Sequence, residues 1–170
     1  MVPLGLAYIG AIMMARSLST VSIVEAQSDM WFIVLQPIGF GLYLVTGLMQ
    51  AYRPPFIEPF ATSIKRGVYG ASYRWQMLLW RVTLAAVLFL VAAMGAVLYL
   101  GGYKGPLLPG PVWMLVKTYA LMAVMVWGGS RLRLLTAGRM LELSWKVLTP
   151  VGLANVLVVG ALILLGVGPS

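Results

Sequence analysis

The sequence predicts an all-α protein, a polytopic transmembrane helical domain with about five spans. Two observations predict this fold class: the composition and the length of the apolar segments. Hydrophobic residues make up 61% of the 170 residues and charged residues only 9%, and the mean hydropathy is +0.95. A soluble domain carries about 25% charged residues because its surface faces water. We therefore expect one transmembrane domain, residues 1–170, that is surrounded by membrane lipids.

The spans follow from five apolar segments in the chain. A helix needs roughly 20 apolar residues to cross the hydrocarbon core of a bilayer, and all segments but the first have about that length. The first is a short or tilted span, or a span cut near its start. No segment shows a pair of half-helices around a polar centre, which argues against a stand-alone transporter. The predicted spans are residues 2–15, 30–49, 77–100, 112–130 and 147–167.

The basic residues predict which side of the membrane each connection faces. They concentrate in residues 51–76 and 131–146, whereas residues 16–29 and 101–111 contain few of them. Positively charged connections stay on the cytoplasmic or matrix side, so the first pair is predicted to be inside. The N-terminus is then inside and the C-terminus outside. The tryptophans near the predicted span ends fit this arrangement, because their rings favour the membrane interface.

Several classes of function are excluded by residues that the chain lacks. It has neither cysteine nor histidine, which removes disulfides, thiolate metal sites, iron–sulfur ligation and His-ligated haem. The net charge of +8 does not indicate nucleic acid as a partner, because the basic residues form no run and no helix face. We expect no metal, no cofactor and no catalytic residue set on this chain.

The predicted inside loop, residues 51–76, is the main candidate for a functional surface. Three prolines within six residues prevent a regular helix at its start, and the side chains between them are too apolar for a freely solvated loop. Two interpretations remain open: a rigid corner with Arg53 near lipid phosphates, or a docking surface or pocket wall for another subunit. The candidate residues are Arg53, Pro55, Phe56, Glu58 and Pro59.

Polar residues inside the predicted spans are the second group of candidates. Arg81 and Lys117 lie near the starts of their spans, where long side chains can reach the interface; the alternative is an intramembrane charge relay. Asn155 is predicted to pack one helix against another. Glu142 and Lys146 are four residues apart, which predicts a surface ion pair.

Five strings, in order along nearly the whole chain, resemble one family. They resemble the span before its quinone-side loop and its motifs R-A-P-F-D-L-P, F-L-G-G-W, W-F-x-x-K and L-G-W-K-V-L-L-P. The family is the H-type membrane subunit of respiratory complex I, NADH:quinone oxidoreductase, and the resemblance covers only its C-terminal half. The strings are Trp31–Phe40, Arg53–Pro59, Tyr99–Tyr103, Trp113–Lys117 and Leu143–Pro150.

The resemblance implies a role in an enzyme complex. The chain would anchor the hydrophilic arm and form part of the quinone chamber, with quinone as the substrate of the complex. Its partners would be other complex I subunits in a mitochondrial or bacterial inner membrane. Since the family's chain has eight spans, the resemblance also implies a split or fragmentary subunit, whose N-terminal half is a separate chain.

The loop departs from the family pattern in its acidic residues. Glu58 is acidic but stands one place from the family's position. Uncharged residues cannot take up a proton as a partly buried carboxylate can. This favours an alternative, a structural or assembly subunit that has lost the coupling carboxylates; the equivalent subunit of a membrane-bound hydrogenase is a further one. The uncharged positions are Gln50, Ile57, Phe60, Thr62, Ile64 and Ser72.

Overall fold

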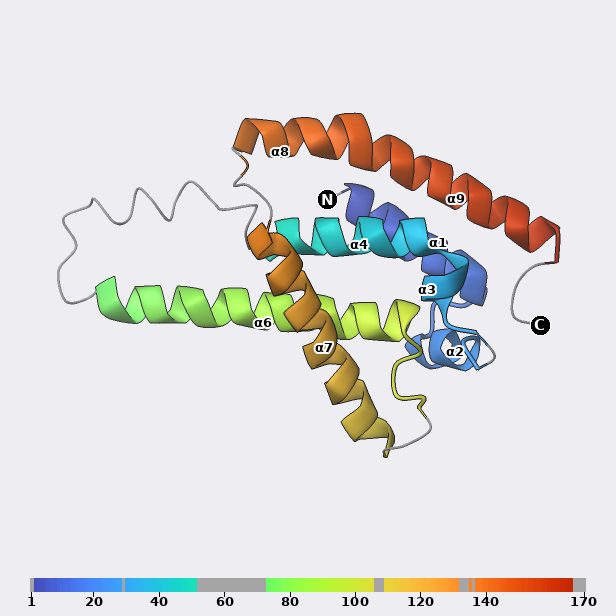
Figure 1. Cartoon of the computed structure of the whole chain (residues 1–170), viewed down its shortest axis with the longest axis horizontal. Helices are drawn as coiled ribbons and strands as arrows, with labels where there is room; N and C mark the ends of the chain where they lie inside the picture. The colour runs from blue at the N-terminus through green and yellow to red at the C-terminus, as the bar shows by residue number, and fades with distance from the viewer. Residues whose placement is uncertain are drawn as a thin grey trace.

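The protein is an arrangement of helices, shown in Figure 1. This computed structural model describes residues 2–28, 30–51, 73–105, 109–131, 135 and 137–166. The secondary-structure elements in these residues are all helices, which confirms the predicted all-α class. In chain order they are α1 (Val2–Ala15), α2 (Thr20–Glu25), α3 (Phe32–Leu35), α4 (Pro37–Gln50), α6 (Tyr73–Tyr99), α7 (Gly110–Arg131), α8 (Ala137–Leu143), the π-helix η1 (Ser144–Leu148) and α9 (Thr149–Leu164).

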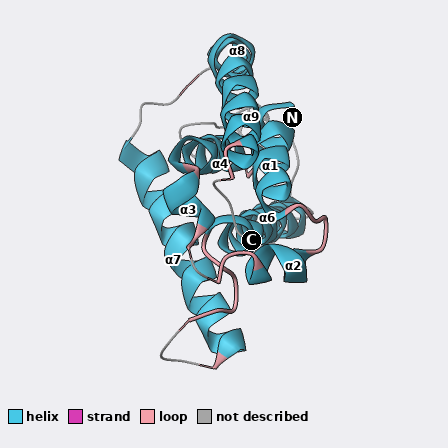
Figure 2. Ribbon diagram, turned by 90° about the vertical axis from the view of Figure 1, so that its right-hand side faces the viewer, coloured by secondary structure: helices cyan, strands magenta, loops and turns pink. Residues whose placement is uncertain are grey.

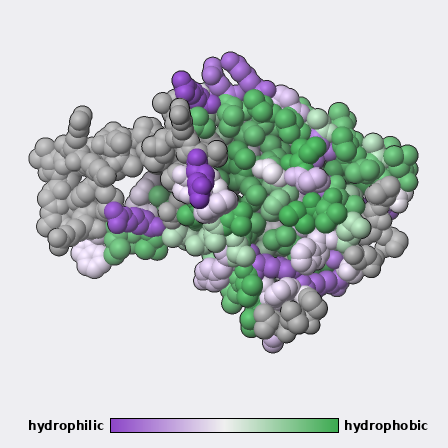
Figure 3. Space-filling view, viewed as in Figure 1, coloured by the Kyte–Doolittle hydropathy of each residue, from purple (hydrophilic) through white to green (hydrophobic). Residues whose placement is uncertain are grey.

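Three helical stretches of the described residues are long and apolar enough to cross a membrane. They are Leu78–Tyr99, Gly110–Arg131 and Gly138–Leu164, and Val2–Ala15 is a shorter apolar helix. Together with α3 and α4, they agree with the predicted count of about five spans. Figure 3 shows a largely hydrophobic face over the helices. Large apolar side chains such as Leu90, Leu157 and Trp127 are exposed on the surface, as contact with lipid requires.

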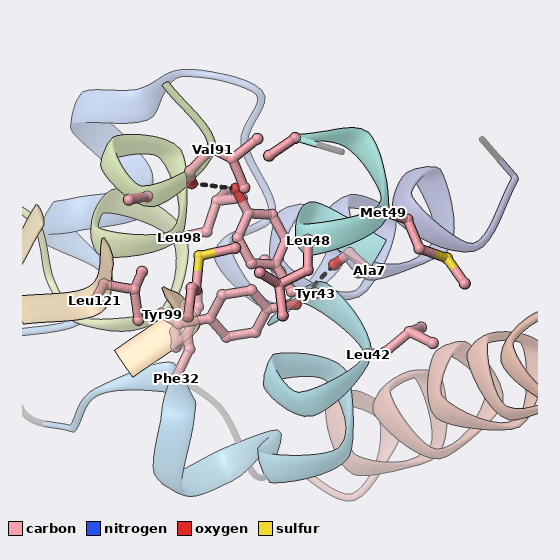
Figure 4. Close-up of a cluster of buried hydrophobic side chains, with 14 of the residues drawn as sticks. Ala7, Phe32, Leu42, Tyr43, Leu48, Met49, Val91, Leu98, Tyr99 and Leu121 are labelled. Atoms are coloured by element: carbon pink, nitrogen blue, oxygen red, sulfur yellow. Dashed lines mark hydrogen bonds between the residues drawn. The ribbon is translucent and has the colours of Figure 1, made fainter. Parts of the chain in front are cut away.

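Helix α4 lies at the centre of the packing. It contacts α1, α6, α7 and α9, while α1 also packs along α9 and α6 packs along α7. Figure 1 shows α7 crossing α6, and Figure 2 shows α9 beside α1. Two tyrosines, neither of them exposed, anchor this core. The Tyr43 hydroxyl donates to Val91 O at 2.6 Å and the Tyr99 hydroxyl donates to Ala7 O at 2.9 Å (Figure 4), so each ring fills space while its polar end is satisfied.

The predicted second span is interrupted at Gln36. Helix α3 ends at Leu35 and α4 begins at Pro37, because proline has no N–H to donate and keeps the preceding residue out of the helical region. Gln36 accordingly has φ −132° and ψ 61°, and its side chain is buried. This break, one turn into the span, was not predicted.

The last span begins earlier than the sequence predicts. Helices α8 and η1 continue into α9, so much of the predicted connection 131–146 is helical. Pro150 cannot donate to the carbonyl of Lys146, and the chain widens into a π-helix in which the Thr149 N–H donates to Ser144 O. The Lys146–Glu142 ion pair is confirmed, at 3.2 Å between exposed side chains. Helix α2, within the predicted connection 16–29, was not predicted.

Gly95 allows α4, α6 and α7 to approach closely, and Gly95→Ala tests this. The new Cβ would lie 2.7 Å from Tyr43 Cε1 and 2.8 Å from Leu121 Cδ2, and overpacking of this kind costs about 1–3 kcal/mol. We expect a lower melting temperature of the full chain in detergent, followed by tryptophan fluorescence. Gly128→Ala in α7 is the control, because no atom lies within 4 Å of its added Cβ. Equal melting of the two variants would contradict this account of the packing.

Candidate functional site: two buried polar clusters

The candidate residues of the predicted inside loop lie outside the described residues. These are Arg53, Pro55, Phe56, Glu58 and Pro59, and their roles stay predictions. The described residues instead contain two clusters of buried polar side chains in or beside the spans. Polar groups at such depth are costly to bury without partners, so their hydrogen bonds indicate what they do.

Lys117 belongs to the first cluster, at the C-terminal end of α6. Its side chain is only 7% exposed, and its Nζ donates to Leu100 O and, at 2.7 Å, to Lys104 O. The same Nζ lies 4.7 Å from the centre of the Trp31 ring and 5.7 Å from that of Trp113, within the range of a cation–π contact. The lysine therefore turns inward onto carbonyl groups and indole rings.

Gln27 completes this cluster. Its Oε1 accepts from the backbone N–H of Gly101 at 2.9 Å and from that of Phe32 at 3.4 Å. Its Nε2 donates to Val97 O at 2.9 Å, to Ile23 O at 3.1 Å and to Leu98 O at 3.3 Å. The side chain is 1% exposed, so one amide joins the segment after α2, the start of α3 and the end of α6.

We call Gln27 and Lys117 the capping cluster, because they satisfy carbonyl groups at the end of α6 that have no helical partner. The helix stops where Gly101 and Gly102 take positive φ values of 69° and 48°, a conformation that glycine adopts at little cost. The two predicted outside connections, 16–29 and 101–111, meet here, as Lys104 Nζ donating to Glu25 O at 3.2 Å also shows.

The structure places Arg81 and Lys117 near opposite ends of α6. It is an exposed residue two turns into α6, whereas Lys117 contacts Leu100 just past the other end of that helix. At 1.5 Å of rise per residue, about 28 Å of helix separates Arg81 from Leu100. Any charge relay between them would need groups besides these two, and the relay stays a prediction.

Gln36, Tyr99 and Asn155 form the second cluster, which we call the central amide site. Gln36 and Asn155 are 2% and 5% exposed. Gln36 Nε2 donates to Gly10 O at 3.1 Å, which ties the break between α3 and α4 to α1. A Cβ added to Gly10 or to Gly39 would lie 3.0 Å from Asn155 Nδ2, so both glycines lie against the amide that α9 contributes.

Neutral amides and a phenol that donates to a carbonyl can hold hydrogen-bonded groups. Within the part of the chain that the structure describes, no group of three or more Asp, Glu, His or Cys side chains could hold a metal ion. Sequence reasoning placed Asn155 between helices but missed Gln27, Gln36 and Tyr99. An isolated glutamine within or beside an apolar span was the signal that could have found two of them, because such a residue needs a partner there.

Comparison with known proteins gives a consistent result over nearly the whole chain. The family described as NADH dehydrogenase matches residues 1–160. The H 1 subunit of the NADH-quinone oxidoreductase of Rhodopseudomonas palustris (strain BisA53) is 39% identical over 161 residues, which cover 94% of this chain and 50% of the relative. The H 2 subunit of the corresponding enzyme of Rhizobium meliloti (strain 1021) is 34% identical over 166 residues, with 94% and 49% covered. The chain spans about half the length of the curated relatives that it matches.

Proposed function

The chain belongs to the NADH dehydrogenase family, and from this we propose that it is a membrane subunit of a proton-translocating NADH:quinone oxidoreductase. The observation that carries the proposal is the match over residues 1–160, together with relatives that are named as H subunits of NADH-quinone oxidoreductase. The resemblance of five ordered strings to the H-type subunit predicts the same family. Three helical stretches of membrane-crossing length, found among the residues that the structure describes, support a place in an energy-transducing inner membrane.

We further propose that the segment between α4 and α6 forms part of the quinone chamber or docks the hydrophilic arm. Helix α4 ends at Gln50 and α6 begins at Tyr73, so this segment joins the bundle at the end of α6 that is remote from the capping cluster. In this proposal Arg53 holds the segment by ion pairing and Phe56 offers apolar surface to the quinone.

Arg53→Ala tests the quinone role. In the assembled complex we expect quinone reduction by NADH to fall at least tenfold, because loss of the ion pairs of Arg53 misplaces the segment. Oxidation of NADH by a soluble artificial acceptor should be unchanged, since it does not need the quinone chamber. The matched control is Arg139→Ala, an exposed arginine of α8. Normal quinone reduction by a complex that carries Arg53→Ala would contradict the proposal that this loop forms part of the quinone chamber.

The split subunit is a separate proposal and needs its own experiment. The chain matches about half the length of its relatives, and we propose that the assembly also contains the half of an H-type subunit that this sequence does not match. Affinity purification of the native assembly through this chain should recover an NADH-oxidising complex that contains that half. Recovery of this chain without an NADH-oxidising complex would overturn the proposed function itself.

A structural or assembly subunit is the second candidate, and the missing carboxylates of the loop favour it. Glu58→Gln removes the acidic group and Ile57→Asp restores one at the position where the family motif has its aspartate. If the loop only holds the complex together, both variants should leave quinone reduction unchanged. A large change in rate with either one would exclude this candidate. A hydrogenase assembly would be recognised by its partner set in the purification above.

A further inference from the structure

The central amide site contains two buried polar atoms without a protein partner. Gln36 Oε1 and Asn155 Nδ2 both have almost no accessible surface and form no hydrogen bond to any described residue. A buried amide atom without a partner costs about 1–3 kcal/mol, and such atoms in native proteins are usually satisfied by an ordered water. The two atoms come from helices far apart in the sequence, the start of α4 and the middle of α9.

Two glycines, which have no Cβ, let these atoms approach one another. The position of a Cβ on Gly10 lies 3.0 Å from both Gln36 Oε1 and Asn155 Nδ2. The position of a Cβ on Gly39 lies 3.0 Å from Asn155 Nδ2, 3.3 Å from Gln36 Oε1 and 3.3 Å from the Tyr99 hydroxyl oxygen. One donor and two acceptors thus lie within 3.3 Å of a single point beside Gly39, so they converge closely enough for one small molecule to contact all three.

We propose that Gln36, Tyr99 and Asn155 bind one internal water molecule between α1, α4, α6 and α9. The water accepts a hydrogen bond from Asn155 Nδ2 and donates one to Gln36 Oε1. Its second hydrogen is donated to the Tyr99 oxygen, which keeps a free lone pair because its own hydrogen goes to Ala7 O. Three bonds are the usual number for a buried water.

The orientation of the Gln36 amide supports water over an ion. Its Nε2 donates to Gly10 O at 3.1 Å; turning the amide over would place its oxygen against that carbonyl oxygen, so Oε1 is the atom that faces the site. A cation would meet no negatively charged group among these three side chains, and an anion would meet the acceptor Oε1 of Gln36. A neutral molecule that both donates and accepts hydrogen bonds fits Asn155 Nδ2 as well as Gln36 Oε1.

An electron-microscopy structure of the native assembly, at a resolution that shows ordered waters, tests the inference directly. We expect a density peak within hydrogen-bond distance of Gln36 Oε1, Asn155 Nδ2 and the Tyr99 oxygen. Direct bonding of the two amides with no peak between them would overturn it, as would an empty site. The result does not depend on the proposed function, because the site can be inspected in whatever assembly the chain joins.

Gly39→Ala places a methyl group in the proposed site. We expect it to remove the peak and to lower the melting temperature of the assembly. Gly41→Ala is the matched control in the same helix, because nothing lies within 4 Å of its added Cβ, and it should keep both the peak and the melting temperature. Should Gly39→Ala fail to fold, Asn155→Leu, which removes the donor, is expected to lose the peak. A peak that persists in either variant would contradict the assignment.

Discussion

Replacing Gln27 with leucine is expected to lower the free energy of unfolding of the chain by about 3–5 kcal/mol, because leucine keeps the volume but removes every hydrogen bond. The backbone N–H groups of Gly101 and Phe32 would lose their acceptor, and the carbonyls at the end of α6 would lose their donor. For a chain of this length a change of this size lowers the melting temperature by roughly 6–20 °C. Thermal unfolding in detergent, followed by tryptophan fluorescence, measures it.

The neighbouring exposed residue Ser28 supplies the control, since Ser28→Ala removes a hydroxyl from the surface. We expect its effect to stay within about 0.5 kcal/mol. Gln27→Glu separates the two halves of the amide, because it keeps an acceptor for Gly101 but faces Val97 O with a second oxygen. If Gln27→Leu melted like Ser28→Ala, the capping cluster would not hold α2, α3 and α6 together.

The fold class and span positions could be predicted because they depend on composition and segment length. Only long apolar helices are stable across the lipid core, and such helices can be recognised in a sequence without knowledge of tertiary contacts. The interruption at Gln36 was missed although Pro37 is visible in the sequence, because prolines are tolerated within membrane helices when neighbours satisfy the freed groups. The contact that holds Gln36 in place, its Nε2 donating to Gly10 O of α1, spans 26 residues, and no local pattern contains it.

The candidate site was only partly predictable for a related reason. Lys117 was recognised as an unusual charge in a span, with a side chain long enough to reach the interface, but the groups that it meets were not predicted. The structure places its Nζ on Leu100 O and Lys104 O, because the chain reverses between α6 and α7 and brings those carbonyls beside it. A lysine's position in a span follows from the sequence, whereas its acceptors depend on how the next turn folds.

Lys117→Met is expected to cost about 2–4 kcal/mol, because hydrogen bonds from a charged donor contribute roughly 1.5–3 kcal/mol each and removal of the buried charge offsets part of the loss. Methionine keeps the unbranched chain that passes Trp31 and Trp113, so the packing is largely retained and the lost groups are the two hydrogen bonds and the cation–π contacts. The melting temperature of the full chain in detergent should fall by roughly 4–16 °C.

Lys104→Met is the matched control for Lys117→Met, because the Lys104 Nζ makes a single exposed hydrogen bond, to Glu25 O. Exposed bonds of this kind contribute little, and we expect a change below about 1 kcal/mol. A similar loss in both variants would mean that the turn tolerates removal of either charge, and Lys117 would then not hold the end of α6. A large loss confined to Lys117→Met would instead identify the buried ammonium group as the element that fixes the connection between α6 and α7, and hence the relative position of these two spans.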